Sequence, residues 1–80
     1  MKEKKIKLIW DLRGPDATKT AEHHAIHLKE YAISENLTEK ITGHTTLSPM
    51  HSIAYLVVIE SEMISVRDIL KPHRGEFYDE

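Results

Sequence analysis

The sequence predicts an α+β domain of β-α-β-β-α-β order, in which two helices cover one face of a four-stranded antiparallel sheet. Three observations carry this prediction. Residues 5–13 alternate between apolar and polar side chains, which is typical of a strand with one buried face. Residues 17–35 repeat small and apolar side chains at helical spacing, and residues 52–60 are apolar on both faces. We expect residues 1–80 to form one domain.

The first strand and helix follow directly from these patterns. Gly14-Pro15-Asp16 ends the strand, because Pro15 has no amide hydrogen for a sheet, and Asp16 is expected to cap the helix that follows. On a helical wheel one stripe of small and apolar residues faces the sheet, and it contains Ala17, Ala21, Ala25, Leu28 and Ala32.

The second half of the chain predicts two strands, a short helix and a last strand. Residues 38–48 form a half-polar strand rich in threonine, and a turn then leads into the apolar strand at 52–60. Ser61 or Ser65 is expected to cap the short helix, which ends before Pro72. The last strand is expected at residues 75–78.

Right-handed crossovers place the first and third strands in the centre of the sheet, an arrangement called ferredoxin-like. We expect the face without helices to carry Ile9, Thr42, His44 and Tyr55. A chain of 80 residues buries only about 60 to 65% of its unfolded surface, so a second copy is expected to cover this face as a homodimer.

Composition argues against several classes of partner. Eleven basic and thirteen acidic residues give a net charge of -2, which does not favour binding to nucleic acid or to anionic lipid. The longest apolar run is far shorter than the roughly 20 residues of a membrane span, and the N-terminus resembles no signal peptide. Together with the absence of cysteine, this predicts a cytoplasmic protein with no nucleic-acid or membrane partner.

Three segments carry a family resemblance. They are the strand KLIW (7–10) before an amphipathic helix, the Gly43-His44 step, and VVIESE (57–62) before the short helix. This layout resembles the dimeric α+β barrel superfamily, which includes small monooxygenase-like and muconolactone-isomerase-like proteins. The resemblance implies two sheets packed face to face and a pocket between helices and sheet, and it assigns no catalytic residue.

The six histidines are the unusual feature of the composition. His23 and His27 have the spacing of the zinc-binding helix H-E-x-x-H, but His24 stands where the catalytic glutamate is required, which argues against a zinc hydrolase. On the helical wheel His24, His27 and Tyr31 form a stripe beside the apolar one. We therefore predict these three as catalytic proton donors or acceptors in a cleft between the first helix and the sheet.

Two alternatives for this stripe stay open. Amphipathic side chains are common where a helix borders a sheet, so the three residues are structural on one interpretation. On the other, the two histidines supply two ligands of a metal site whose third ligand the sequence does not identify. The prediction itself includes no metal.

A second predicted site lies between the two sheets of the dimer. His44, Asp11 and Arg13, together with Lys7, would supply acid, base and anion-binding groups for a ligand there. The alternative is an ordinary polar interface. His51 and His73 are interpreted as exposed loop residues, and no motif identifies a cofactor.

Two functions of different class remain. The first is a small-molecule-binding protein or a cofactor-independent enzyme of isomerase or monooxygenase type, which requires a pocket at the His24 stripe. The alternative is a non-catalytic homodimeric interaction or regulatory module, in which Trp10, Leu28 and Tyr31 fill that cleft.

Overall fold

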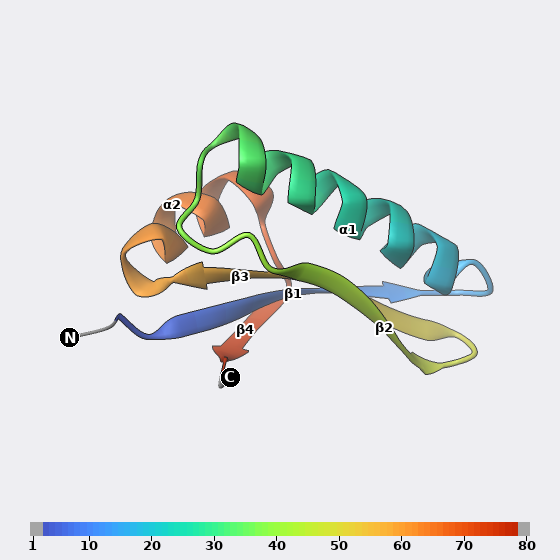
Figure 1. Ribbon diagram of the computed structural model, residues 1–80. Coiled ribbons are helices and arrows are strands. Elements are labelled where there is room, and N and C mark those ends of the chain that lie inside the picture. Colours follow the sequence, from blue (N-terminus) through green and yellow to red (C-terminus); the bar gives the residue numbers. More distant parts are fainter. Residues whose placement is uncertain (1–2, 79–80) are drawn as a thin grey trace.

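A computed structural model describes residues 3–78, so residues 1–2 and 79–80 of the expected domain lie outside the described residues. The predicted order of elements is confirmed (Figure 1). The elements are β1 (Lys5–Arg13), α1 (Ala17–Ser34), β2 (Thr42–Ser48), β3 (His51–Ile59), α2 (Glu60–Leu70) and β4 (Arg74–Phe77).

The four strands form one antiparallel sheet in the order β2-β3-β1-β4, with β1 and β3 in the centre as predicted. β1 pairs with β3 along its whole length, from Lys5 opposite Ile59 to Arg13 opposite His51. β4 is shorter and pairs only with residues 6–9 of β1. The far end of β1 therefore has a strand on its β3 side alone.

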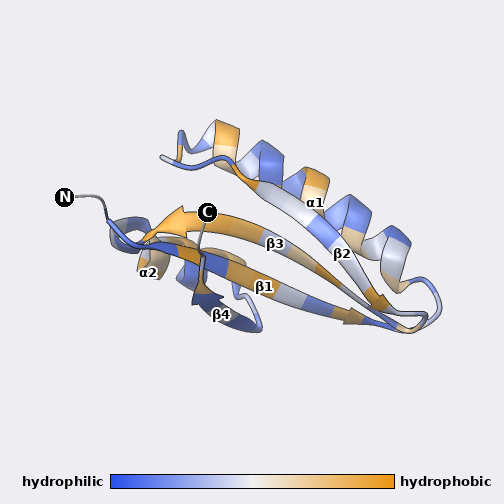
Figure 2. Cartoon of the chain, turned by 60° about the horizontal axis from the view of Figure 1, so that its bottom comes forward, coloured by the Kyte–Doolittle hydropathy of each residue, from blue (hydrophilic) through white to orange (hydrophobic). Residues whose placement is uncertain are grey.

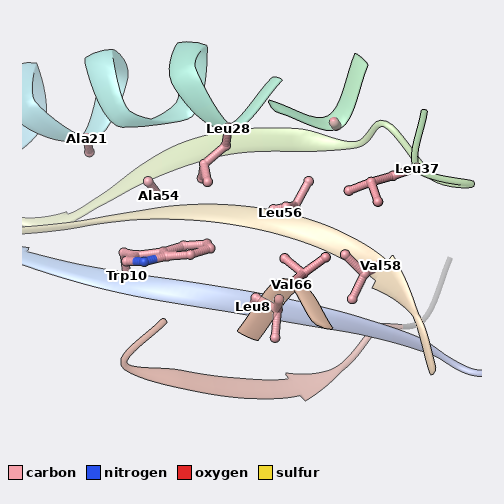
Figure 3. Close-up of a cluster of buried hydrophobic side chains, with 10 residues drawn as sticks. Leu8, Trp10, Ala21, Leu28, Leu37, Ala54, Leu56, Val58 and Val66 are labelled. Carbon is pink, nitrogen blue, oxygen red and sulfur yellow. The ribbon is translucent and has the colours of Figure 1, made fainter. Parts of the chain in front are cut away.

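The core lies between the sheet and the two helices, and Figure 3 shows side chains from both layers meeting there. α1 packs over β2 and β3, and α2 packs over β1 and β3. Every residue of the predicted alanine-rich stripe of α1 is buried, which lets the helix lie close to the sheet. The Trp10 indole N–H donates a hydrogen bond of 3.1 Å to the Leu70 carbonyl and so ties β1 to the end of α2.

The predicted cap of α1 is right in position but not in its hydrogen bond, and the predicted cap of α2 at Ser61 or Ser65 is wrong. Asp16 occupies the N-cap of α1, but its side chain makes no capping hydrogen bond. α2 begins at Glu60 directly after β3, so Ser61 lies in its first turn, where its hydroxyl donates to Glu3 instead. The second strand begins at Thr42, four residues later than expected, because residues 38–41 connect α1 to the sheet without joining it as a strand.

The placement of β2 side chains also differs from the prediction. Directly paired residues of an antiparallel sheet point to the same face. His44 pairs with Ala54, which is buried under α1, and the Thr46 hydroxyl lies 3.0 Å from that of Thr18 on α1. Thr42 and His44 are thus on the helix face, and the expectation that they face a second subunit is wrong. The two faces of β2 are similarly polar, so the pattern of its side chains does not indicate which face packs against the helices.

The open face is the side of the sheet without helices, and it carries Ile9 and Tyr55 as expected. Its apolar side chains are nevertheless buried within the chain: Ile9 is 1% exposed and Val57 is fully buried. Longer side chains lie on this face. Lys7 Nζ is 4.4 Å from the centre of the Tyr55 ring, and that ring lies over Gly43, where a Cβ would come within 2.5 Å of the tyrosine oxygen.

This arrangement changes the argument for a second copy. The apolar side chains on which that expectation depended are already covered by polar and aromatic side chains of the same chain. Figure 2 shows β1 changing between hydrophilic and hydrophobic residues along its length, as a strand between two different environments does. Any partner on the open face would meet charged groups and Tyr55 first.

The core predicts the effect of one truncation. Leu56→Ala removes a fully buried side chain beneath the helices and should lower the free energy of unfolding by about 2–5 kcal/mol. Ile64→Ala, at an exposed position on α2, is the matched control and should change it by less than about 0.5 kcal/mol. Urea denaturation followed by circular dichroism measures both values. Similar losses in the two variants would contradict the described core.

Candidate functional site

A cluster of polar side chains gathers around Asp11 on the open face. The Asp11 carboxylate lies 2.8 Å from His51 Nε2 and accepts two hydrogen bonds from Arg74, 3.0 Å from Nε and 3.2 Å from Nη2. The Asp11 backbone N–H donates to His73 Nδ1 at 2.8 Å. We call Asp11, His51, His73 and Arg74 the Asp11 cluster.

The central position of β1 explains why these residues meet. Asp11 has β3 on one side, where His51 stands opposite Arg13 and therefore diagonal to Asp11. On the other side Arg74 stands opposite Ile9, again diagonal to Asp11. His73 precedes β4, and its ring takes the place that a further β4 residue would occupy beside the Asp11 amide.

The Asp11 carboxyl stays ionised in the folded chain. Hydrogen bonds from Arg74 and then from His51 hold its pKa well below the usual 3.8, although partial burial acts in the opposite direction. An ionised carboxylate only accepts hydrogen bonds, so His51 must carry a proton on Nε2. In the neutral ring Nδ1 then holds the free lone pair, and no hydrogen bond to Nδ1 is seen within residues 3–78.

The chemical consequence is a histidine oriented for proton transfer. A carboxylate that fixes the tautomer of an imidazole also stabilises the imidazolium that forms when the free nitrogen takes a proton. The His51 side chain is 19% exposed, so solvent or a small molecule reaches part of it. The half-exposed Arg74 guanidinium lies beside it and has further N–H groups that Asp11 does not use.

The structure brings together part of the second predicted site. Asp11 and Arg13 lie on the same face of β1, and Arg13 is exposed and directly opposite His51. His44 is separated from them, since it lies across the sheet and lines a depression with Glu22 and Lys29 beside α1. Lys7 shares the open face but covers the Tyr55 ring.

The predicted catalytic stripe on α1 divides between core and solvent. The His24 ring packs edge-on against Trp10, with 5.1 Å between ring centres, and among the described residues its buried Nε2 has no hydrogen-bond partner. Tyr31 packs against the core, and burial followed by the charge of Glu35 raises its pKa. His27 points outward, with Nδ1 3.2 Å from a Glu30 carboxylate oxygen. The catalytic role of the three residues stays a prediction.

The space beneath α1 is filled by side chains. Trp10 and Leu28 are buried in the core cluster, and Tyr31 packs against its margin. This is the packing expected for the non-catalytic alternative. Across residues 3–78, no group of three or more histidine, aspartate or glutamate side chains is placed to hold a metal ion. In the same range no helix is both long enough and apolar enough to cross a membrane.

Sequence reasoning missed three members of the Asp11 cluster. The sequence places His51 and His73 in exposed loops and gives no role to Arg74. The position of His51 could have been predicted. The tight turn after Ser48 makes His51 the first residue of the apolar strand, and the central position of that strand brings His51 close to the end of β1. His73 and Arg74 have no comparable signal, because the register of β4 depends on where a short helix ends.

Comparison with known proteins gives no relative from which a function could be inferred: no family model, no curated protein and no solved structure matches this chain.

The hydrogen bonds of Asp11 predict a pH-dependent loss of stability. Asp11→Asn should lower the free energy of unfolding at about pH 7 by about 1–2 kcal/mol, because the amide places N–H groups against donors. Folding lowers the pKa of Asp11 from its usual 3.8, so the ionised carboxylate stabilises the fold fully above about pH 3.8. This stabilisation is lost progressively as the pH falls below that value. The difference between the two proteins should therefore shrink at about pH 3.

Urea denaturation at both pH values measures this difference. Asp68→Asn is the matched control, since that carboxylate is exposed on α2 and its loss should change the free energy of unfolding little at either pH. If both variants lost the same stability, or if the Asp11 difference did not depend on pH, the cluster as described would be wrong.

The half-buried His24 predicts a second effect of pH. Burial, followed by the charges of His27 and His73, lowers the pKa of His24 below 6.5. Below that value the unfolded chain takes up a proton that the folded chain resists, so stability should fall as the pH decreases from about 7.5 to about 5.5. His24→Phe should make this fall smaller, whereas His23→Phe, at an exposed position, should leave it unchanged. Equal pH dependence of both variants in urea denaturation would refute the burial of His24.

Proposed function

We propose that this chain is a small-molecule-binding protein or cofactor-independent enzyme of isomerase type, and that its site is the open face around the Asp11 cluster. The observation that supports this most directly is the 2.8 Å contact between Asp11 and His51 Nε2. It leaves His51 Nδ1 as a base beside a guanidinium group.

The ligand class follows from the charges around this base. Arg13, directly opposite His51, and Arg74, which shares Asp11 Oδ1 with His51, are exposed cations, and both suit a carboxylate through paired N–H groups. A carboxylate held there would present its neighbouring carbon to His51. For a substrate in which this carbon lies between a ketone carbonyl and a C=C bond, Nδ1 takes the proton from it, the C–H electron pair delocalises through both groups as a dienolate, and the protonated His51 returns the proton to the far carbon of the C=C bond. The double bond of the substrate is thereby moved.

A homodimer is part of this proposal. A second copy packed on the open face would exclude water from the Asp11 cluster, and electrostatic effects are larger in a site without water. The resemblance to dimeric α+β barrels and the small size of the chain support this assembly. The polar and aromatic covering of the open face implies an interface with many hydrogen bonds.

Proton transfer can be tested without knowing the natural substrate. A panel of keto acids and unsaturated carboxylic acids is incubated with the protein in D₂O, and loss of carbon-bound hydrogen is followed by proton NMR. We expect catalysed exchange for a subset of the panel. His51→Gln should slow it by about 100-fold or more, because the base is lost. Arg13→Gln should raise the concentration needed for half-maximal exchange.

His44→Gln is the control, because it changes a histidine on the opposite face and should leave exchange unaltered. Exchange that is absent for the whole panel, or unaffected by His51→Gln, would overturn the proposed enzyme.

The alternative function is a non-catalytic homodimeric interaction module. It is favoured by one observation, the filling of the space beneath α1 by Trp10, Leu28 and Tyr31. On this alternative His24, His27 and Tyr31 are structural, and the Asp11 cluster only stabilises the sheet or the interface. A dimer in sedimentation equilibrium that binds no member of the acid panel would favour it over the enzyme.

A further inference from the structure

A groove lies on the helix face between α2 and β4, on the opposite side of the sheet from His51. It arises because α2 packs over β1 and β3 and, within residues 3–78, has no contacts with β4, so the sheet next to β4 has no helix above it. The groove has a volume of about 420 Å³, which is in the range of small-molecule sites. Its apolar lining includes Ile6, Leu8, Met63, Pro72 and Phe77.

The apolar part of the groove is open to a ligand. Phe77 is 67% exposed, whereas Leu8, which also lines the groove, is buried in the core. Lys4 Nζ lies 5.1 Å from the centre of the Phe77 ring and adds a cation at that end. An aromatic ring left at the mouth of an apolar groove is the kind of surface that binds the body of a small hydrophobic molecule.

The polar part of the groove favours an anion. Arg67 lines it with a half-exposed guanidinium, whose contact with Asp68 is long at 3.5 Å. His73 also lines it, and the Asp11 amide N–H donates to its Nδ1. The neutral His73 ring must then carry its proton on Nε2, where it is a donor. Glu76 is the acidic residue of the lining, but it pairs with Lys7 in the register and so points to the open face.

We propose that this groove binds a small amphipathic carboxylate, whose apolar body contacts Met63 and Phe77 and whose carboxylate is held by Arg67 and His73. The volume, the apolar lining and the positive edge together select this class over neutral lipids and over cations. The site differs from that of the proposed function, because the proposed base His51 and Arg13 lie on the other face of the sheet, and the two sites share His73, which Asp11 holds through its backbone N–H.

Octanoate and octan-1-ol are suitable probes, since they share an apolar chain and differ in charge. Titration into ¹⁵N-labelled protein, followed by amide chemical shifts, should move the resonances of Ile6, Met63 and Phe77. We expect octanoate to bind more tightly than octan-1-ol. Arg67→Gln should weaken the binding of octanoate by at least about fivefold, because the charged contact is lost. The affinity for octan-1-ol should change by less than about twofold, because this probe has no charge.

Gly75→Leu provides a variant that fills the groove without disturbing the sheet. Gly75 is opposite Leu8, and a Cβ added there would meet its nearest neighbours at 3.5 Å or more, an ordinary contact distance. This variant should remove binding of both probes. Glu76→Gln, one residue further and on the opposite face, is the matched control and should bind octanoate no more weakly than the natural chain.

Three results would overturn the proposal. The first is the absence of octanoate-induced shifts at the groove, and the second is octan-1-ol binding as tightly as octanoate. The third is concentration-dependent broadening of the groove resonances without ligand, which would mean that a second copy occupies the groove. His51→Gln should retain octanoate binding, so failure of the proposed enzyme is distinguishable from failure of this site.

Discussion

The pairing of β1 with β3 along their whole length is the constraint on which the rest of the structure depends. It directs Leu8 and Trp10 under the helices and Ile9 and Asp11 to the open face. A shift of one residue in this register would exchange the two sets. Such a shift would expose Trp10 and bury Asp11 beneath the helices, and burying an unpaired carboxylate is costly. The core and the Asp11 cluster are therefore consequences of the same register.

Asp11 connects the two faces of the molecule through different atoms. Its carboxylate orients His51 and Arg74 on the open face, while its backbone N–H lies in the plane of the sheet and holds His73. His73 in turn lines the groove on the helix face. One residue of the central strand thus fixes the tautomer of two imidazoles, because a carboxylate can only accept a hydrogen bond and an amide N–H can only donate one.

Much of the fold is predictable because its strongest signals are hydrophobic. The bounds of β1 and the buried stripe of α1 follow from a regular spacing of apolar residues, and the central position of β3 follows from a run that is apolar on both faces. The face of β2 could not be predicted in this way, since His44 and Thr45 on its two faces are both polar. The predicted capping hydrogen bonds of Asp16 and Ser61 failed for another reason: a residue that suits a cap can bond elsewhere or not at all.

The candidate site was only partly predictable, because it depends on register and not on composition. The alternation of β1 predicts that Asp11 and Arg13 share one face of the sheet, and the structure confirms that they do. Their partnership with His51 requires knowing which residue of β3 stands opposite Arg13, and an irregularity between Thr46 and Ser48 shifts the pairing of the hairpin near that point. Residue types alone therefore gave equal weight to His44, which lies on the wrong side.

The last two elements shape both proposed sites. A β4 that paired with all of β1 would offer a backbone carbonyl to the Asp11 amide, and the His73 ring would have no place there. α2 packs over β1 and β3 and has no contacts with β4 within residues 3–78, and this leaves Ile6 and Phe77 at the groove uncovered. The core draws on β1, β3 and both helices, and within residues 3–78 it includes no side chain of β4. Polar and partly exposed side chains can therefore gather at the β4 edge of the sheet without reducing the burial of the core.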